Sequence, residues 1–324
     1  MMHIKKLFCL LLLAGPWQFA LANVNTACNG TQQKPCVVQD TKNNTRELKN
    51  WRTSNMLQKA AAKTKKLNTA GLDNLWMSTS GAASINGFTA IVVNIQNTTD
   101  NKVKKIIDVD LRQESHGYLN NDAISLAAEN NWGNLGKTRK QVFNDEKKWL
   151  KDLSKDATIT DVLTPAQFKA KQFQQGTTLQ IKTVKNEKEV AESRKMQYFR
   201  LTVTDHMAPT DGDVDRFVEL VRKTKPGTWL HFHCLAGDER GTTFMVMYDM
   251  LHNADKVSLE DIIKREAAVA PYYNVLKTDS PDANKVPLYQ KRALFIRKFY
   301  VFSQAYLNGY IEKWSTWSDK HHDL

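Results

Sequence analysis

One short unit near residue 230 constrains the fold of this chain more than any other feature. The segment TWLHFH (228–233) has the composition of a β-strand, and the apolar segment 242–252 has that of a buried helix. A loop that begins with Cys234 and ends with Arg240 separates them. This strand-loop-helix unit indicates an α/β layer, in which strand and helix pack on each other.

The loop from Cys234 to Arg240 has the residues that an oxyanion site needs. Its N–H groups can curl around a tetrahedral oxyanion, and the N-terminus of the following helix adds partial positive charge. The same field favours Cys234 as the nucleophilic thiolate. Arg240 offers a planar fork for two phosphate oxygens, and Gly237 lets the backbone approach a ligand. A lone cysteine is more often an inert buried residue, but these neighbours predict phosphoryl transfer to Cys234.

Phosphoryl transfer to sulfur also needs a proton donor for the leaving oxygen. The candidate is Asp205 in VTDHMAPTDGD, which follows the predicted strand 198–203. The alternative for Asp205 is a turn residue, or a cap for the helix that begins near Asp213. Because Cys234 follows on the next strand-loop unit, we expect Asp205 to supply the missing acid.

The rest of the chain predicts an α/β core with a largely parallel sheet and one interruption. A further strand is predicted at KKIIDVDLRQE (104–114), and helices are predicted at 187–195, 212–223, 259–268 and 293–307. The polar stretch 118–186 interrupts the alternation of strands and helices, so we expect an inserted, mainly β subdomain there. The predicted organisation is a signal peptide at 1–22, a lead-in segment at 23–70 with a short helix at 56–66, a core at 71–117 and 187–324, and the insert at 118–186.

Residues 1–22 have the features of a signal peptide: a basic start, an apolar run and a terminal small-x-small sequence, ALA. The apolar run is too short to span a membrane, so we expect a periplasmic or secreted protein without stable membrane insertion. Removal of the signal leaves Cys28, Cys36 and Cys234 in a compartment where thiols tend to pair. A disulfide could close the polar turn between Cys28 and Cys36 and leave Cys234 free.

The net charge of +12 favours an anionic partner such as polyphosphate, nucleic acid or a membrane surface. Charge alone does not choose among them. The sequence has no RNA-binding aromatic signature and no Cys/His zinc spacing, so we expect no nucleic-acid partner.

Four segments together resemble the protein-tyrosine-phosphatase-like phytases: VDLRQESHGYLN, ENNWGNLGKT, TDHMAPT and HCLAGDERGTTFMVMYDML, in this order. HCxxGxxR alone indicates only the wider cysteine-phosphatase superfamily, whereas RQESHGYL and NWGNLGK are more specific. The resemblance implies a phosphatase α/β core with a small β-barrel insert. It also implies hydrolysis of inositol hexakisphosphate without a metal ion or other cofactor.

The resemblance implies a role for several residues of this chain. Cys234 would be the nucleophile that forms a phosphocysteine, Arg240 the phosphate clamp, and Asp205 the general acid and later the base that activates water. The substrate-binding residues would be His206, Arg112, Lys277, Lys285, Gly237, Asp238, Glu239, Gly241 and Thr242. For the two lysines the alternative is a solvated loop position.

Two features depart from the family pattern. Asp238 and Glu239 precede Arg240, where small or neutral residues are usual, and Gly241 stands where a hydroxyl residue is expected. We expect the two acidic side chains to point outward, although they place negative charge near a pocket for an anion. Thr242 could replace the hydroxyl that Gly241 lacks.

The predicted function is a metal-independent phosphomonoesterase that acts on inositol polyphosphates. Two alternatives remain open. One is an exported protein-tyrosine phosphatase with the same chemistry, which preference for phosphotyrosine peptides would favour. The other is a catalytically impaired inositol-polyphosphate-binding module, which binding without phosphate release would favour.

Overall fold

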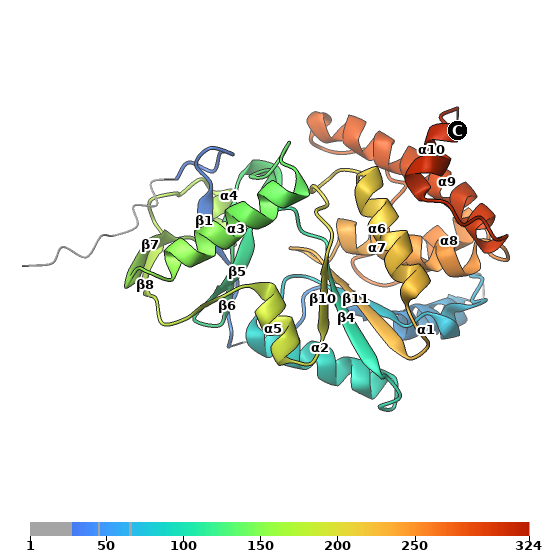
Figure 1. Cartoon of the computed structure of the whole chain (residues 1–324), viewed down its shortest axis with the longest axis horizontal. Helices are drawn as coiled ribbons and strands as arrows, with labels where there is room; N and C mark the ends of the chain where they lie inside the picture. Colours follow the sequence, from blue (N-terminus) through green and yellow to red (C-terminus); the bar gives the residue numbers. More distant parts are fainter. Residues whose placement is uncertain (1–27, 45, 65–66, 324) are drawn as a thin grey trace, which may run out of the picture.

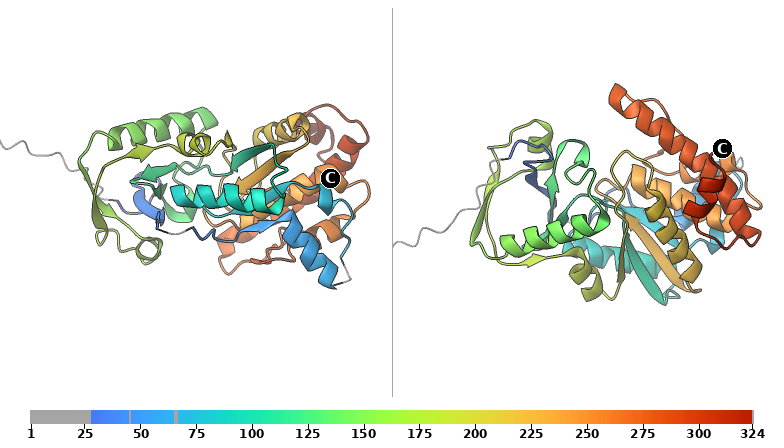
Figure 2. Two further views of the ribbon diagram at one scale, coloured as in Figure 1. Left: turned by 90° about the horizontal axis from the view of Figure 1, so that it is seen from below. Right: turned by 45° about the horizontal axis from the view of Figure 1, so that its top comes forward.

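The computed structural model describes residues 28–44, 46–64 and 67–323. The predicted signal peptide, residues 1–22, lies outside the described residues. Two separate groups of strands are present: a central five-stranded sheet, and smaller sheets at the opposite end of the molecule from the C-terminal helices (Figure 1; Figure 2). None of the helices in the described ranges has the length and apolar character needed to cross a membrane.

The central sheet is largely parallel, as the sequence predicts. Its strand order is β10 (Gln197–Arg200), β4 (Lys105–Asp110), β11 (Thr228–His233), β3 (Met77–Ser80) and β2 (Arg52–Thr53). Only β2 is antiparallel to its neighbour. His233 is paired with Asp110 of β4 and Ser80 of β3, so the carboxyl ends of three strands meet where Cys234 begins the loop.

Helices cover both faces of the central sheet (Figure 1). One face carries α6 (Asp211–Lys223), α7 (Glu239–Asn253), α8 (Leu259–Glu266), α9 (Val286–Leu307) and α10 (Trp314–Lys320); the other carries α2 (Ile85–Thr98) and α5 (Glu187–Ser193). Phe217 of α6 and Phe244 of α7 pack on Phe232 of β11. Trp229 of the same strand belongs to the core beneath α2, because alternate side chains of a strand face opposite sides.

The smaller sheets do not form the closed barrel that the family resemblance implies. One has the antiparallel order β1 (Cys36–Thr41), β6 (Asp122–Ala127), β5 (His116–Leu119) and β9 (Val184–Lys185), and the other pairs β7 (Thr158–Val162) with β8 (Thr177–Gln180). Main-chain hydrogen bonds between Leu163, which follows β7, and residues of β1 join the four-stranded and the two-stranded sheets. The ring stays open because no ladder pairs β8 with β9 within the described ranges, and β9 is only two residues long.

Strand β1 lies within the segment 23–70, which we predicted as a lead-in. It pairs antiparallel with β6, with Cys36 opposite Ala127, and a disulfide joins Cys36 to Cys28. This N-terminal part of the chain is therefore built into the smaller sheet, while α1 (Ser54–Thr64) lies beside the central domain. Helices α3 (Arg139–Leu153) and α4 (Pro165–Lys169) complete the smaller region, and single 3-10 turns occupy Leu72–Asn74, Glu129–Asn131 and Ala283–Lys285.

Candidate active site

Cys234 is the free cysteine of the described chain, and its side chain is 3% exposed. The loop that it begins leads into α7, whose first residue is Glu239. The predicted partner cysteines are bonded to each other, which leaves the thiol of Cys234 unpaired, as predicted. A reduced thiol at the end of a strand and before a helix is the arrangement that nucleophilic sulfur requires.

The carbonyl groups of residues 235–238 are all held from outside the loop. The donors are Ala82 N to Leu235 O (3.1 Å), Asn50 Nδ2 to Ala236 O (2.9 Å), Arg52 Nη1 to Gly237 O (2.7 Å) and Thr242 N to Asp238 O (2.9 Å). The N–H groups of the same four residues donate no hydrogen bond to any residue that the structure describes. A loop with its carbonyls turned outward leaves these N–H groups for an anion.

Arg52 supports the loop through hydrogen bonds, a role that was not predicted from the sequence. Its guanidinium is almost fully buried and donates to Gly237 O and to the hydroxyl of Thr242. Burial holds the pKa of Arg52 below its usual value, although the charges of Glu266 and Asp238 act in the opposite direction. Arg52 lies on a two-residue strand far from the loop in sequence, so no local pattern could have identified it.

Two glycines of the loop region are required by close contacts. Gly237 has φ +68°, and a Cβ there would lie 2.2 Å from the backbone nitrogen of Gly81. A Cβ at Gly241 would lie 2.3 Å from Thr79 Oγ1, a buried hydroxyl without a hydrogen-bond partner among the described residues. Thr242 Oγ1 donates to Asp238 O (2.7 Å), so its proton is directed at the loop backbone rather than at the thiol.

Arg240 is held rigidly by a buried carboxylate. Its two terminal nitrogens donate to the two oxygens of Glu114, each at 2.8 Å. Its Nε lies 3.1 Å from Asp205 Oδ1 but in poor hydrogen-bond geometry, so this buried donor is left without a true partner in the described chain. Burial lowers the pKa of a guanidinium, but Asp205 and Glu114 hold the pKa of Arg240 well above its usual value. Arg240 is therefore a fixed positive charge whose Nε faces Asp205 without a hydrogen bond among the described residues.

Asp205 is positioned by the NWGNLGK segment, for which the sequence indicated no role beyond family resemblance. Asn131 Nδ2 donates to Asp205 Oδ2 (2.6 Å), and Trp132 Nε1 donates to its backbone carbonyl (3.0 Å). The carboxylate is 14% exposed and lies beside Arg240. The structure thus brings Asp205 and Arg240 together, in the arrangement that an acid next to a phosphate clamp requires.

His206 and Lys285 lie in one corner beside this acid. Lys285 Nζ is 3.1 Å from His206 Nε2, and His206 Nδ1 is 3.2 Å from Glu239 Oε2. Glu239 also forms an ion pair with the buried Arg292. The carboxylate of Glu239 is 12% exposed because it lies against Arg292 and His206, and the expected orientation away from the loop interior stays a prediction. Asp238 is also only partly exposed, and its Oδ1 is buried without a partner in the described ranges.

Arg112 and Lys277 lie apart from this corner. Arg112 is 1% exposed and pairs with Glu114 (3.0 Å) and Asp40 (3.1 Å), so both of its partners are carboxylates of the protein. Lys277 is about half exposed and lies 3.5 Å from Asp279. Contact of either residue with substrate therefore stays a prediction.

A buried charge network lies on the α5 side of the loop. His233, which precedes Cys234, has its Nε2 2.6 Å from Glu187 Oε1. Burial lowers the pKa of a histidine, but Glu187 and Asp108 raise the pKa of His233 to about 10. His116 lies 3.1 Å from Asp110 and 3.2 Å from Glu187, and the pKa of His116 is raised to about 9, chiefly by Asp110 acting against burial.

Two groups in this network have ligand atoms close enough to hold a metal ion: Asp108 with Glu187 and His233, and Asp110 with His116 and Glu187. Arg200 adds a third positive charge, with its Nε 3.1 Å from Asp110 Oδ2. The cations of the protein thus already compensate these carboxylates, which is how buried charges are usually accommodated.

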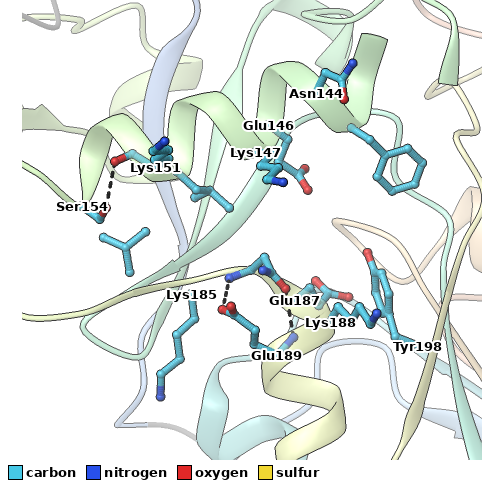
Figure 3. A pocket seen from close by; sticks show the side chains of 14 residues that line it. Asn144, Glu146, Lys147, Lys151, Ser154, Lys185, Glu187, Lys188, Glu189 and Tyr198 are labelled. Atoms are coloured by element: carbon cyan, nitrogen blue, oxygen red, sulfur yellow. Dashed lines mark hydrogen bonds between the residues drawn. The ribbon is translucent and has the colours of Figure 1, made fainter. Parts of the chain in front are cut away.

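A cavity of about 630 Å³ lies between α3 and the start of α5 (Figure 3). Its walls include Lys147, Lys151, Lys185 and the buried Glu187. None of its lining residues belongs to the loop 234–240, and one of them, Glu187, pairs with His233, the residue before Cys234.

A parallel sheet whose central strand leads through a Cys-x5-Arg loop into a buried helix defines the class of cysteine-phosphatase-like α/β proteins. Residues 109–252 match the family model of protein tyrosine phosphatase-like phytases, described as "Inositol hexakisphosphate". A protein tyrosine phosphatase-like phytase from Bdellovibrio bacteriovorus has a similar structure (TM-score 0.69, 31% identity), and the match covers 87% of this chain and 94% of that one. The chain belongs to the protein tyrosine phosphatase-like phytase family.

Two further relatives are longer than this chain. The protein tyrosine phosphatase-like myo-inositol phosphatase of Mitsuokella multacida, solved in complex with myo-inositol-(1,3,4,5)-tetrakisphosphate, is 31% identical with a TM-score of 0.75, over 88% of this chain and 49% of that one. Effector protein hopD2 of Pseudomonas syringae pv. tomato is 30% identical over 213 residues, which are 65% of this chain and 46% of that protein. The chain thus spans about half the length of these two relatives.

Proposed function

We propose that this protein is a cysteine-dependent phosphomonoesterase that hydrolyses myo-inositol hexakisphosphate and lower inositol polyphosphates through a phosphocysteine intermediate. One observation carries the proposal: the carbonyls of residues 235–238 are all bonded, whereas the N–H groups of these residues and Arg240 Nε have no acceptor among the described residues, in the loop that Cys234 begins. Membership of the phytase family supports this activity.

The first chemical step transfers the phosphoryl group to sulfur. The thiolate of Cys234 attacks phosphorus, the bond to the ester oxygen breaks, and Asp205 gives its proton to that oxygen. In the second step a water molecule gives a proton to the carboxylate of Asp205 and attacks phosphorus, and the S–P bond breaks to return the thiolate. The loop N–H groups and Arg240 stabilise the charge of the equatorial oxygens in both steps, which is the largest contribution expected of such a site.

The choice of an inositol polyphosphate rests on the basic residues beside the loop. Lys285, His206 and Arg292 lie next to Asp205 and Glu239, where further phosphates of a ring would be placed. The net charge of +12 also favours a polyanionic substrate. The alternative of a protein-tyrosine phosphatase uses the same chemistry, but its substrate has no second phosphate for Lys285 to contact.

We also propose that the protein works in an oxidising compartment after export. The Cys28–Cys36 disulfide supports this, because structural disulfides persist outside the cytosol. The predicted signal at 1–22 would provide the route.

The direct test is phosphate release from myo-inositol hexakisphosphate by residues 23–324, with a metal chelator present, beside the Cys234→Ser variant. We expect release by the parent and none by the variant. Failure of the parent, with phosphotyrosine peptide also inert and the hexakisphosphate still bound, would replace the proposed enzyme with a binding module. Preference for the phosphotyrosine peptide would replace it with a tyrosine phosphatase.

A further inference from the structure

The carboxylate of Glu239 lies in a corner of the protein that is built to hold an anion. Arg292, 1% exposed, forms an ion pair with Glu239 Oε1, and His206 Nδ1 lies 3.2 Å from Oε2. The ring of Tyr289 lies 4.5 Å from the guanidinium of Arg292. Burial raises the pKa of a carboxyl, but the hydrogen bond with His206 and the charge of Arg292 hold the pKa of Glu239 below its usual value. Glu239 is therefore an ionised carboxylate among donors.

The donors of this corner are themselves fixed. Arg292 Nη2 donates to the hydroxyl oxygen of Tyr273 (2.6 Å), which orients the guanidinium. Lys285 Nζ lies 3.1 Å from His206 Nε2 and Glu239 Oε2 lies 3.2 Å from His206 Nδ1, so both ring nitrogens have a partner. The corner contains the positive charges of Arg292 and Lys285 and the carboxylate of Glu239, and the carboxylate of Asp205 lies at its edge. Such a site suits a phosphate as well as it suits a carboxylate.

The corner lies next to both Arg240 and Asp205. Glu239 directly precedes Arg240 in the loop, and His206 directly follows Asp205, with its Nε2 4.0 Å from Asp205 Oδ2. His206 also has φ +67°, a strained conformation for a non-glycine residue that persists only where the surroundings enforce it. A ring that places one phosphate in the loop would bring a neighbouring phosphate towards this corner.

We infer that Glu239 is a specificity-determining residue whose carboxylate occupies a second phosphate subsite, formed by Arg292, His206 and Lys285. This inference rests on the proposed function and deepens it. A substrate with one phosphate needs only the loop. A polyphosphate must displace Glu239 from Arg292 or tolerate its charge, so this chain discriminates against highly phosphorylated rings and favours those with fewer phosphates.

The test compares two variants that remove the same formal charge. Glu239→Gln and, as a control outside the site, Glu260→Gln are made in the Cys234→Ser background, so that binding is measured without turnover. Titration calorimetry then gives the affinity for myo-inositol hexakisphosphate and for inorganic phosphate. We expect Glu239→Gln to bind the hexakisphosphate about tenfold more tightly, because a like charge inside the subsite is removed, while its affinity for inorganic phosphate changes by less than about threefold. Glu260→Gln should leave the ratio of the two affinities close to that of the parent.

A second measurement keeps the inference testable if Glu239→Gln is unstable. Lys285→Met leaves Glu239 and Arg292 intact, and it should weaken binding of the hexakisphosphate while the affinity for inorganic phosphate changes by less than about threefold. Equal tightening by Glu239→Gln and Glu260→Gln, no tightening by Glu239→Gln, or equal weakening for both ligands by Lys285→Met would overturn the inference. These outcomes are independent of the proposed activity, whose failure would appear only as absence of phosphate release from the protein with Cys234 intact.

Discussion

Replacement of Glu114 by Gln tests whether this buried carboxylate holds Arg240 in its position. Glu114 accepts hydrogen bonds from both terminal nitrogens of Arg240 (2.8 Å each) and from Arg112 Nε (3.0 Å). All three side chains are at most 2% exposed. Glutamine keeps the volume but removes the charge and turns one acceptor into a donor that faces a guanidinium.

The expected loss follows from these contacts. Removing one partner of a buried ion pair costs about 3–5 kcal/mol, because the remaining charge is left uncompensated. Asp205 and Asp40 remain beside the two arginines, so the lower end of this range, about 3 kcal/mol, is expected. That is a large share of the roughly 5–15 kcal/mol that stabilises a typical folded domain.

Urea denaturation of the parent and of Glu114→Gln measures this loss through the shift of the midpoint at unchanged slope. Glu260→Gln is the matched control, because Glu260 is 81% exposed and lies 3.8 Å from Lys264, and it should change the free energy of unfolding by less than about 0.5 kcal/mol. A loss below about 1 kcal/mol for Glu114→Gln would refute the reasoning.

The difference in the free energy of unfolding between the parent and Glu114→Gln should depend on pH. Burial raises the pKa of a carboxyl, but Arg240 and Arg112 hold the pKa of Glu114 well below its usual value of 4.5. A depressed pKa contributes stability above the unfolded value and loses it as the pH falls towards the folded value. The gap between parent and variant should therefore be constant near neutral pH and shrink below about pH 4.5.

Three further predictions concern the loop and the disulfide. Arg52→Lys should lower kcat/KM roughly 100-fold towards p-nitrophenyl phosphate, because an amine cannot hold Gly237 O and a hydroxyl together; unchanged kinetics would contradict the bracing role. Gly241→Ala should cost about 1–3 kcal/mol in thermal denaturation, and Thr79→Ala should relieve most of that cost, whereas an equal cost in both backgrounds would exclude the clash. The denatured, unreduced protein of residues 23–324 should show one free thiol and its Cys28→Ser variant two, with a count of three in the parent contradicting the disulfide.

The proposed reacting residues could be predicted from the sequence, because each follows a local pattern of strand or helix residues. The apolar alternation before Cys234 predicts β11, and the buried run after Arg240 predicts α7. Asp205 follows the predicted strand at 198–203, and neighbouring parallel strands bring their carboxyl ends to one edge of a sheet. The structure confirms the parallel arrangement and brings Asp205 within 3.1 Å of Arg240.

The supports of the loop could not be predicted, because they depend on contacts between distant parts of the chain. Arg52 and Asn50 are separated from the loop by more than 180 residues, and nothing in their neighbours marks them as ligands of loop carbonyls. The pairing of Glu239 with Arg292 was not predicted, because Arg292 is on a helix 53 positions further along the chain. Charge pairs of this kind have no local signature.

Helix α2 shows why part of the fold was missed. Its segment INGFTAIVVNIQNT is rich in β-branched residues, which favour strands by propensity. Phe88, Ile91 and Ile95 nevertheless lie on one face of a helix and are buried in the core that contains Trp229. Tertiary burial of that face outweighs local propensity, and the hydroxyl of Ser84 caps its first turn.

The central claim is that Cys234 carries the phosphoryl group during turnover. Asp205→Asn with p-nitrophenyl phosphate tests it most directly, since this leaving group needs little protonation while hydrolysis of the intermediate still needs the carboxylate. Rapid mixing should release about one p-nitrophenolate per active site in a burst, and mass spectrometry after acid quench should find the phosphoryl group on the peptide that contains Cys234. Turnover without a burst, or a phosphoryl group on another residue, would contradict the account.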